Sequence, residues 1–187
     1  IACLTNLTML DLRDNELETL GPEICNLPAL AELYLDSNAL TTLPGAIGNL
    51  AALTTLDIGG NEVASLPASI SQLTNLTELD LSGNGLTTIP PEIFKLTSLK
   101  TLRLGGNDFE TLPADLAALT ALTVLDLNDN GLTALTPVVG QLTALTELHI
   151  SFNDFHAVPH ELEGLSNLTI LYLDSNSMTV LPPLMGD

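Results

Sequence analysis

The chain has 187 residues, of which 45% are hydrophobic and only 3% aromatic. Four lysines and arginines face 23 aspartates and glutamates, so the formal net charge is −19. This balance argues against nucleic acid and anionic membranes as partners, because both attract basic surfaces. It is compatible with a basic protein partner and with simple solubility. No apolar run reaches the ~18 residues of a membrane span. No basic segment followed by an apolar one opens the sequence, so we expect no signal peptide in it.

One asparagine recurs at a constant interval from one end of the chain to the other. A fixed period over a whole sequence predicts a stacked array of similar coils rather than a globule around one centre. We expect a single repetitive domain over residues 1–187, made of eight units that begin at residues 4, 27, 50, 73, 96, 119, 142 and 165. The periodic asparagines are Asn15, Asn38, Asn61, Asn84, Asn107, Asn130, Asn153 and Asn176.

The first unit shows the pattern of the others. Leu7, Leu10 and Leu12 precede Asn15, and Leu17 follows it. The alternation Leu-x-Leu predicts a short strand with leucine inward. Stacked units then place these strands in a parallel sheet. We expect the asparagine amide to lie inside, where it can bond backbone groups that the turn leaves free.

The second half of a unit reads Leu-Pro-x-x-Ile, as in Leu43, Pro44 and Ile47. Proline fixes φ and lacks a donor, so we expect a short helical or 3-10 turn on the outer face. Pro22 and Pro137 stand one place late, and we expect irregular outer turns there. Three residues occupy a leucine position and are predicted to be core: Phe109, Phe155 and Met178.

These motifs resemble the leucine-rich repeat family, in its 23-residue variety, over the whole chain. The resemblance implies an α/β fold, a right-handed solenoid with a parallel sheet on its concave face and short 3-10 or helical turns on its convex face. It also implies a module that holds another protein on the concave face, with no enzymatic activity, cofactor or metal. The variety looks like that of intracellular scaffolds, including Ras-associated ones, and of bacterial repeat proteins. A cytoplasmic location is therefore favoured, with a secreted bacterial protein as the alternative.

Both ends of the sequence suggest a segment of a longer array. Residues 1–3 match the tail of a unit, and Asp187 stands where a unit closes. We expect apolar core at both edges, with end-to-end self-association as the alternative to further repeats. Cys3 and Cys25 lie one coil apart, so they could be bridged or could be two reduced thiols.

Acidic residues concentrate on the predicted concave face. Asp57 and Asp80 should stack about 5 Å apart on neighbouring strands, an arrangement of like charges that destabilises a sheet. A cationic partner or a metal ion would relieve the repulsion; alternatively, both charges are solvated filler of the repeat. The outward centres of the strands are Asp11, Tyr34, Asp57, Asp80, Arg103, Asp126, His149 and Tyr172.

An apolar cluster is predicted in the C-terminal half of this face. Ile170 and Tyr172 should lie beside His149 and Phe152, and tyrosine is favoured at binding hot spots. The alternative is local packing of Phe152 against its neighbour. Arg103, with Lys100 on the same strand, is the lone basic spot and could pair with Asp80 or Asp126.

Other polar residues give no sign of catalysis or metal binding. His156 and His160 flank a turn rather than share a helix face, so the three histidines are interpreted as solvated. The glycine pairs at residues 59–60 and 105–106 open no helix and precede no lysine, which argues against a phosphate loop. The hypotheses left are a protein-binding module with an acidic concave face, a structural spacer or adhesion segment of a surface protein, and a subunit of an enzyme whose catalytic domain lies elsewhere.

Overall fold

The computed structural model describes residue 1 and residues 3–180. Eight three-residue strands form one parallel sheet in chain order, each hydrogen-bonded to the next. This confirms the predicted sheet. The strands are β1 (Met9–Asp11), β2 (Glu32–Tyr34), β3 (Thr55–Asp57), β4 (Glu78–Asp80), β5 (Thr101–Arg103), β6 (Val124–Asp126), β7 (Glu147–His149) and β8 (Ile170–Tyr172).

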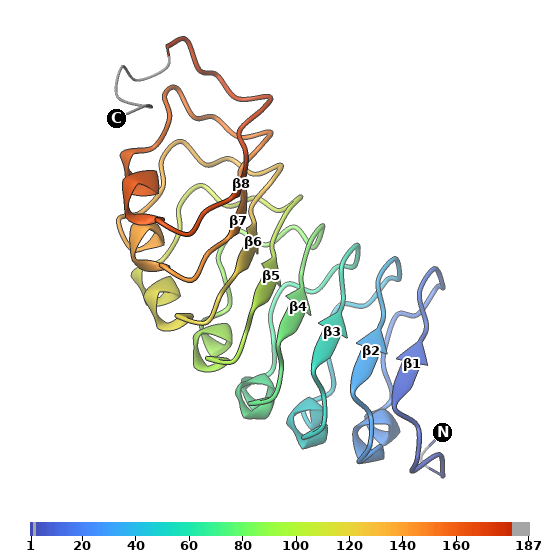
Figure 1. Cartoon of the computed structure of the whole chain (residues 1–187). Coiled ribbons are helices and arrows are strands. Elements are labelled where there is room, and N and C mark those ends of the chain that lie inside the picture. Colours follow the sequence, from blue (N-terminus) through green and yellow to red (C-terminus); the bar gives the residue numbers. More distant parts are fainter. Residues whose placement is uncertain (2, 181–187) are drawn as a thin grey trace.

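Short 3-10 helices follow strands β1 to β7 on the other side of the coils. Figure 1 shows the coils stacked along an arc, with the sheet on its inner side and the helical turns on its outer side. The predicted solenoid is therefore confirmed. The 3-10 helices are η1 (Pro22–Asn26), η2 (Ile47–Asn49), η3 (Ala68–Gln72), η4 (Pro91–Lys95), η5 (Ala114–Ala118), η6 (Val139–Gln141) and η7 (His160–Gly164).

The strands form because leucine alternates with residues that tolerate solvent. The central leucines of β2 to β7 are fully buried, whereas the residues on either side are half-buried. Each buried leucine contributes about 1.5–3 kcal/mol. Since no coil can bury its own leucines, the core exists only between stacked coils. Phe109 and Phe155 are buried within it and Met178 packs partly against it, as predicted.

The irregular outer turns predicted at the two late prolines are found only in part: η1 lacks the closing backbone bond that the other six turns have. η1 has five residues with Pro22 at its start, where a helix needs no amide donor. η6 has only three residues, but so does η2, whose Pro44 stands at the usual place. The short turns share a different feature, a central glycine: Gly48 in η2 and Gly140 in η6.

The periodic asparagines form a ladder between coils. Asn84 Nδ2 donates to the carbonyls of Ile58, Leu81 and Ser82, and its Oδ1 accepts the Val63 amide. Asn61, Asn107 and Asn153 are buried in the same way, whereas Asn15 in the first coil is exposed.

The two cysteines are free thiols, Cys3 exposed and Cys25 buried. Burial raises the pKa of the Cys25 thiol. Asp187, which was expected to close the last unit, lies outside the described residues. Within the described part of the chain, no helix has the length and apolar character to cross a membrane.

Candidate functional site

The predicted row of outward strand centres is one continuous line along the inner face. The sheet pairs Asp57 with Asp80, Arg103 with Asp126, and His149 with Tyr172. Asp11 and Tyr34 extend the row at the β1 end of the sheet. The register therefore brings together side chains that lie a full repeat apart in the sequence.

The aspartates of this row also hold the turn that follows each strand. Asp57, Asp80 and Asp126 each accept the backbone amide two residues on, at 3.0, 2.8 and 2.9 Å. Asp11 does the same for Arg13 at 3.1 Å. Such local bonds stabilise turns. The alternative interpretation, in which these aspartates are a regular part of the repeat, thus has a structural basis that the sequence analysis missed.

Asp57 has the most perturbed carboxyl group of the row. Burial raises its pKa to about 6, and the charges of Asp80 and Asp36 add to this effect, while the Gly59 amide and Arg103 oppose it. The charge of the stacked Asp80 thus acts on this carboxyl group in the same direction as burial, the larger cause.

The Asp57→Asn variant is expected to be more stable than the wild type at pH 7. The folded-state pKa of Asp57, about 6, lies above the unfolded value of 3.8, so the folded protein binds more protons between these values. The wild-type free energy of unfolding therefore falls as pH rises from about 4 to 6. Because Asp57 is only half-buried, solvent screening limits the gain to about 1 kcal/mol. Urea unfolding at pH 4 and pH 7 measures it.

Asp126→Asn is the matched control for this prediction. It removes one charge from the same row and keeps the acceptor for its turn, but Asp126 stands between Arg103 and His149. We expect no gain at pH 7. Equal gains in the two variants would show that net charge, rather than the Asp57–Asp80 pair, destabilises the protein.

Arg103 forms an ion pair that the sequence did not predict. Its Nη1 donates to Glu78 Oε1, diagonally across to β4, rather than to Asp80 or Asp126. The suggested pairing with those aspartates is thus wrong, because the long side chain reaches the glutamate at the far end of the neighbouring strand. Lys100 precedes β5 instead of belonging to it.

A second basic residue, Arg13, was missed by the sequence analysis. Its guanidinium bonds Asp11 through two nitrogens, at 3.0 and 2.7 Å, and lies 5.2 Å from the centre of the Tyr34 ring. This bond lowers the pKa of the Asp11 carboxyl to about 2. Both arginines of the inner face are therefore engaged by the protein's own carboxylates.

The predicted apolar cluster at the C-terminal end of the face is exposed. Phe152, Tyr172 and Ile170 have exposed fractions of 57%, 50% and 38%. The His149 and Tyr172 rings meet edge to face, with centres 4.7 Å apart, and His149 Nε2 lies 3.4 Å from Glu147 Oε2.

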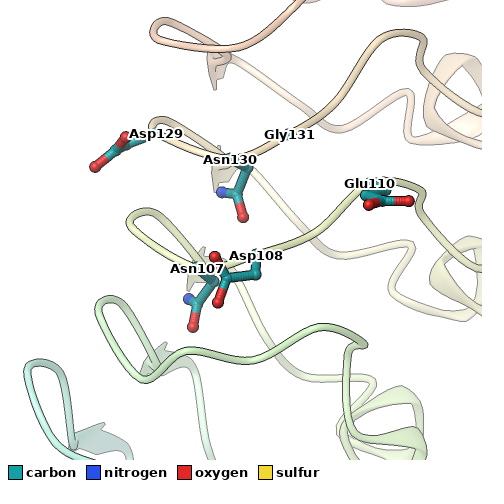
Figure 2. A pocket seen from close by; sticks show the side chains of 6 residues that line it. All are labelled: Asn107, Asp108, Glu110, Asp129, Asn130 and Gly131. Carbon is teal, nitrogen blue, oxygen red and sulfur yellow. The ribbon is translucent and has the colours of Figure 1, made fainter.

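The loops after β5 and β6 enclose a shallow, largely acidic hollow of about 330 Å³. Figure 2 shows Asp129 and Glu110 at opposite ends of it, so the carboxylates do not converge. Among the described residues, no group of three histidine, cysteine, aspartate or glutamate side chains is placed to hold a metal ion.

A curved stack of similar coils with an inner parallel sheet and an asparagine ladder defines a leucine-rich repeat protein. The chain belongs to this family: the family described as Leucine rich repeat matches residues 5–63, 74–132 and 120–178. The family described as Leucine Rich repeats (2 copies) matches residues 51–93. The fold is generally a non-enzymatic scaffold, and in this general sense the chain is a protein-interaction module.

Solved structures of bacterial proteins are similar to this chain. A leucine-rich repeat protein of Leptospira interrogans is 39% identical, with a TM-score of 0.92 over 97% of this chain and 46% of that one. An internalin (inlF) of Listeria monocytogenes is 29% identical, with a TM-score of 0.75 over 91% of this chain and 48% of that one. The chain thus spans about half the length of these two proteins.

A third similar structure is internalin C2 of Listeria monocytogenes. It is 26% identical, with a TM-score of 0.80 over 96% of this chain and 76% of that one. The comparison with curated proteins finds no match.

Proposed function

We propose that the chain binds a basic protein partner on the inner face of its sheet, through the row from Tyr34 to Tyr172 and the adjoining Phe152 and Ile170. The observation that carries the proposal is the in-register pair of Asp57 and Asp80. Stacked carboxylates destabilise the sheet. A cationic surface laid over them would offset this cost, so binding and the relief of repulsion are coupled.

The distribution of the basic residues supports the same partner class. Arg13 is bonded to Asp11, and Arg103 is bonded to Glu78. Each arginine thus has an acidic partner within the chain, whereas Asp57 and Asp80 form no ion pair among the described residues. With a net charge of −19, the protein attracts basic partners over a distance as well as at contact.

Affinity capture identifies partners that depend on this face. The wild type is compared with a quadruple variant in which Tyr34, Arg103, His149 and Tyr172 are alanine. A partner retained by the wild type and lost from the variant is then purified, and its dissociation constant is measured at ~50 and ~300 mM salt. Charge-driven binding is expected to weaken several-fold at the higher salt, because exposed charges are screened.

The double variant Asp57→Asn and Asp80→Asn tests the acidic pair directly. Asparagine keeps the acceptor for the turn and removes the charge, so binding is expected to weaken while the fold persists. The control is Glu92→Gln with Asp115→Asn, which removes two charges from the outer turns η4 and η5. Binding that ignores salt and survives the inner-face change, or that weakens equally in the control, would contradict the proposal.

A further inference from the structure

The N-terminal coils contain a complete binding arrangement for an arginine side chain. The Arg13 guanidinium is held by the Asp11 carboxylate, lies 3.8 Å from Asp36, and stands over the Tyr34 ring at 5.2 Å. Three elements therefore hold this cation: an aromatic face and carboxylates from two neighbouring coils. A planar guanidinium suits this combination because it both stacks and forms paired hydrogen bonds.

Two of these three repeat positions recur six coils later without the cation. The third, Asp11, is replaced there by His149, whose ring packs edge to face on Tyr172. Tyr172 and Asp174 occupy the positions in their coil that Tyr34 and Asp36 occupy in the second coil. Ser151 takes the place of Arg13, and its hydroxyl donates to the Asp174 carboxylate. Residues 104–187 contain no lysine or arginine.

Phe152, which follows Ser151 in the chain, adds a second exposed aromatic residue to this end of the face at a cost in backbone strain. Its φ is +54°, and its amide donates to the Asp174 carbonyl at 3.1 Å. A bulky residue in this left-handed region is a clear outlier. The other seven coils carry glycine, serine or aspartate at the equivalent position: Asp14, Ser37, Gly60, Gly83, Gly106, Asp129 and Ser175.

Neither burial nor backbone geometry accounts for this phenylalanine. Its side chain is 57% exposed, so it contributes little to the core, and its backbone conformation favours a smaller residue. Strained residues concentrate at functional sites, which points to a contact with something outside the chain. Asp129 occupies the equivalent position in the neighbouring coil.

We propose that Phe152, Tyr172 and Asp174 form a binding site for an arginine side chain of the partner protein. The guanidinium would stack on the aromatic rings and approach the Asp174 carboxylate, as Arg13 lies over the Tyr34 ring and 3.8 Å from the Asp36 carboxylate within the chain. This inference rests on the proposed function, which it deepens: it assigns the C-terminal end of the face to arginine, whereas the acidic pair at Asp57 and Asp80 requires only positive charge.

The test uses two nine-residue peptides of alternating glycine with either arginine or lysine. Both have the same charge, so long-range attraction to the acidic protein is matched, and only arginine stacks well. Isothermal titration calorimetry with the wild type is expected to show binding at least threefold tighter for the arginine peptide, as about 0.7 kcal/mol of stacking predicts. Equal affinities would overturn the proposal.

Two variants locate the preference. In Phe152→Gly and in Tyr172→Leu, the preference for arginine is expected to fall toward equality. Phe152→Gly also relieves the backbone strain, so its urea midpoint is expected to rise, which separates lost binding from lost folding. Ser37→Gly is the matched control, because it also introduces glycine at an equivalent positive-φ position, but far from the proposed binding site. A preference that persists in both aromatic variants would contradict the assignment.

Opening the N-terminal arrangement provides a test by gain of binding. Arg13→Ser exposes Tyr34, Asp11 and Asp36, so the number of arginine peptides bound per chain is expected to rise from one to two. If the number of bound peptides did not change, the proposed similarity between the Arg13 arrangement and the site at Tyr172 would be refuted. If a captured partner loses affinity on the Asp57 and Asp80 change but not on Phe152→Gly, the proposed function stands and this inference fails.

Discussion

Replacing Asn84 with alanine is expected to lower the free energy of unfolding by about 3 kcal/mol, at the upper end of the cost of an unsatisfied buried group. The side chain is 7% exposed and makes four hydrogen bonds, three as a donor and one as an acceptor. Two of its partners, Ile58 and Val63, belong to the preceding coil. Alanine would leave these backbone groups without partners in a place that water reaches poorly. Urea unfolding followed by circular dichroism measures the loss.

Asn15→Ala is the control for this experiment, with the same substitution at an equivalent position. Asn15 is exposed, and its amide donates only within its own coil, to Leu12 at 3.0 Å and Arg13 at 2.9 Å. Because solvent can replace those bonds, we expect a loss below about 1 kcal/mol. Equal losses in the two variants would show that the ladder stabilises individual turns rather than the stacking of coils.

The fold was predictable because a strict period fixes the register of every strand. A constant repeat length leaves one way to place Leu33 beside Leu56 and Asp57 beside Asp80, and the structure has this pairing. The inward and outward assignment follows from the alternation of leucine with polar residues. The same regularity placed Phe109 and Phe155 in the core.

Side-chain partners on the inner face were less predictable, because several acids lie within reach of each arginine. Arg103 selects Glu78 over Asp80 and Asp126, a choice that depends on rotamers rather than on register. The bonds from strand aspartates to the following turn have a usable signal, since aspartate often accepts an amide two residues on. That signal was masked by the interpretation of the aspartates as surface charge.

The strain at Phe152 could have been inferred from the repeats themselves. Three of the eight equivalent residues are glycine, which is frequent where φ is positive. A comparison of the eight equivalent residues would have predicted that phenylalanine strains the backbone at this position. The outer turns offered a similar clue: glycine at residues 48 and 140 marks the two three-residue turns, whereas the late prolines do not.

Gly48→Ala is expected to destabilise the protein by about 2 kcal/mol, within the usual range for overpacking. A Cβ at residue 48 would stand 2.3 Å from the Ser69 carbonyl oxygen and 2.7 Å from Gln72 Oε1. The glutamine can move, but the carbonyl belongs to the backbone of η3. The added methyl group must therefore push the second and third coils apart on their outer side. Urea unfolding is again the measurement.

Gly45→Ala, three residues away in the same coil, separates this clash from the general effect of replacing glycine. A Cβ there would meet nothing within 4 Å, so the variant is expected to be neutral or more stable by up to about 0.5 kcal/mol. Gly140, four coils further on, allows the same test at a second site. A Cβ added there would stand 2.7 Å from the Glu161 carbonyl oxygen. Gly140→Ala should destabilise in the same direction but by less, because its clash is milder. If all three variants behaved alike, close approach of the outer turns could not be the reason for glycine in η2 and η6.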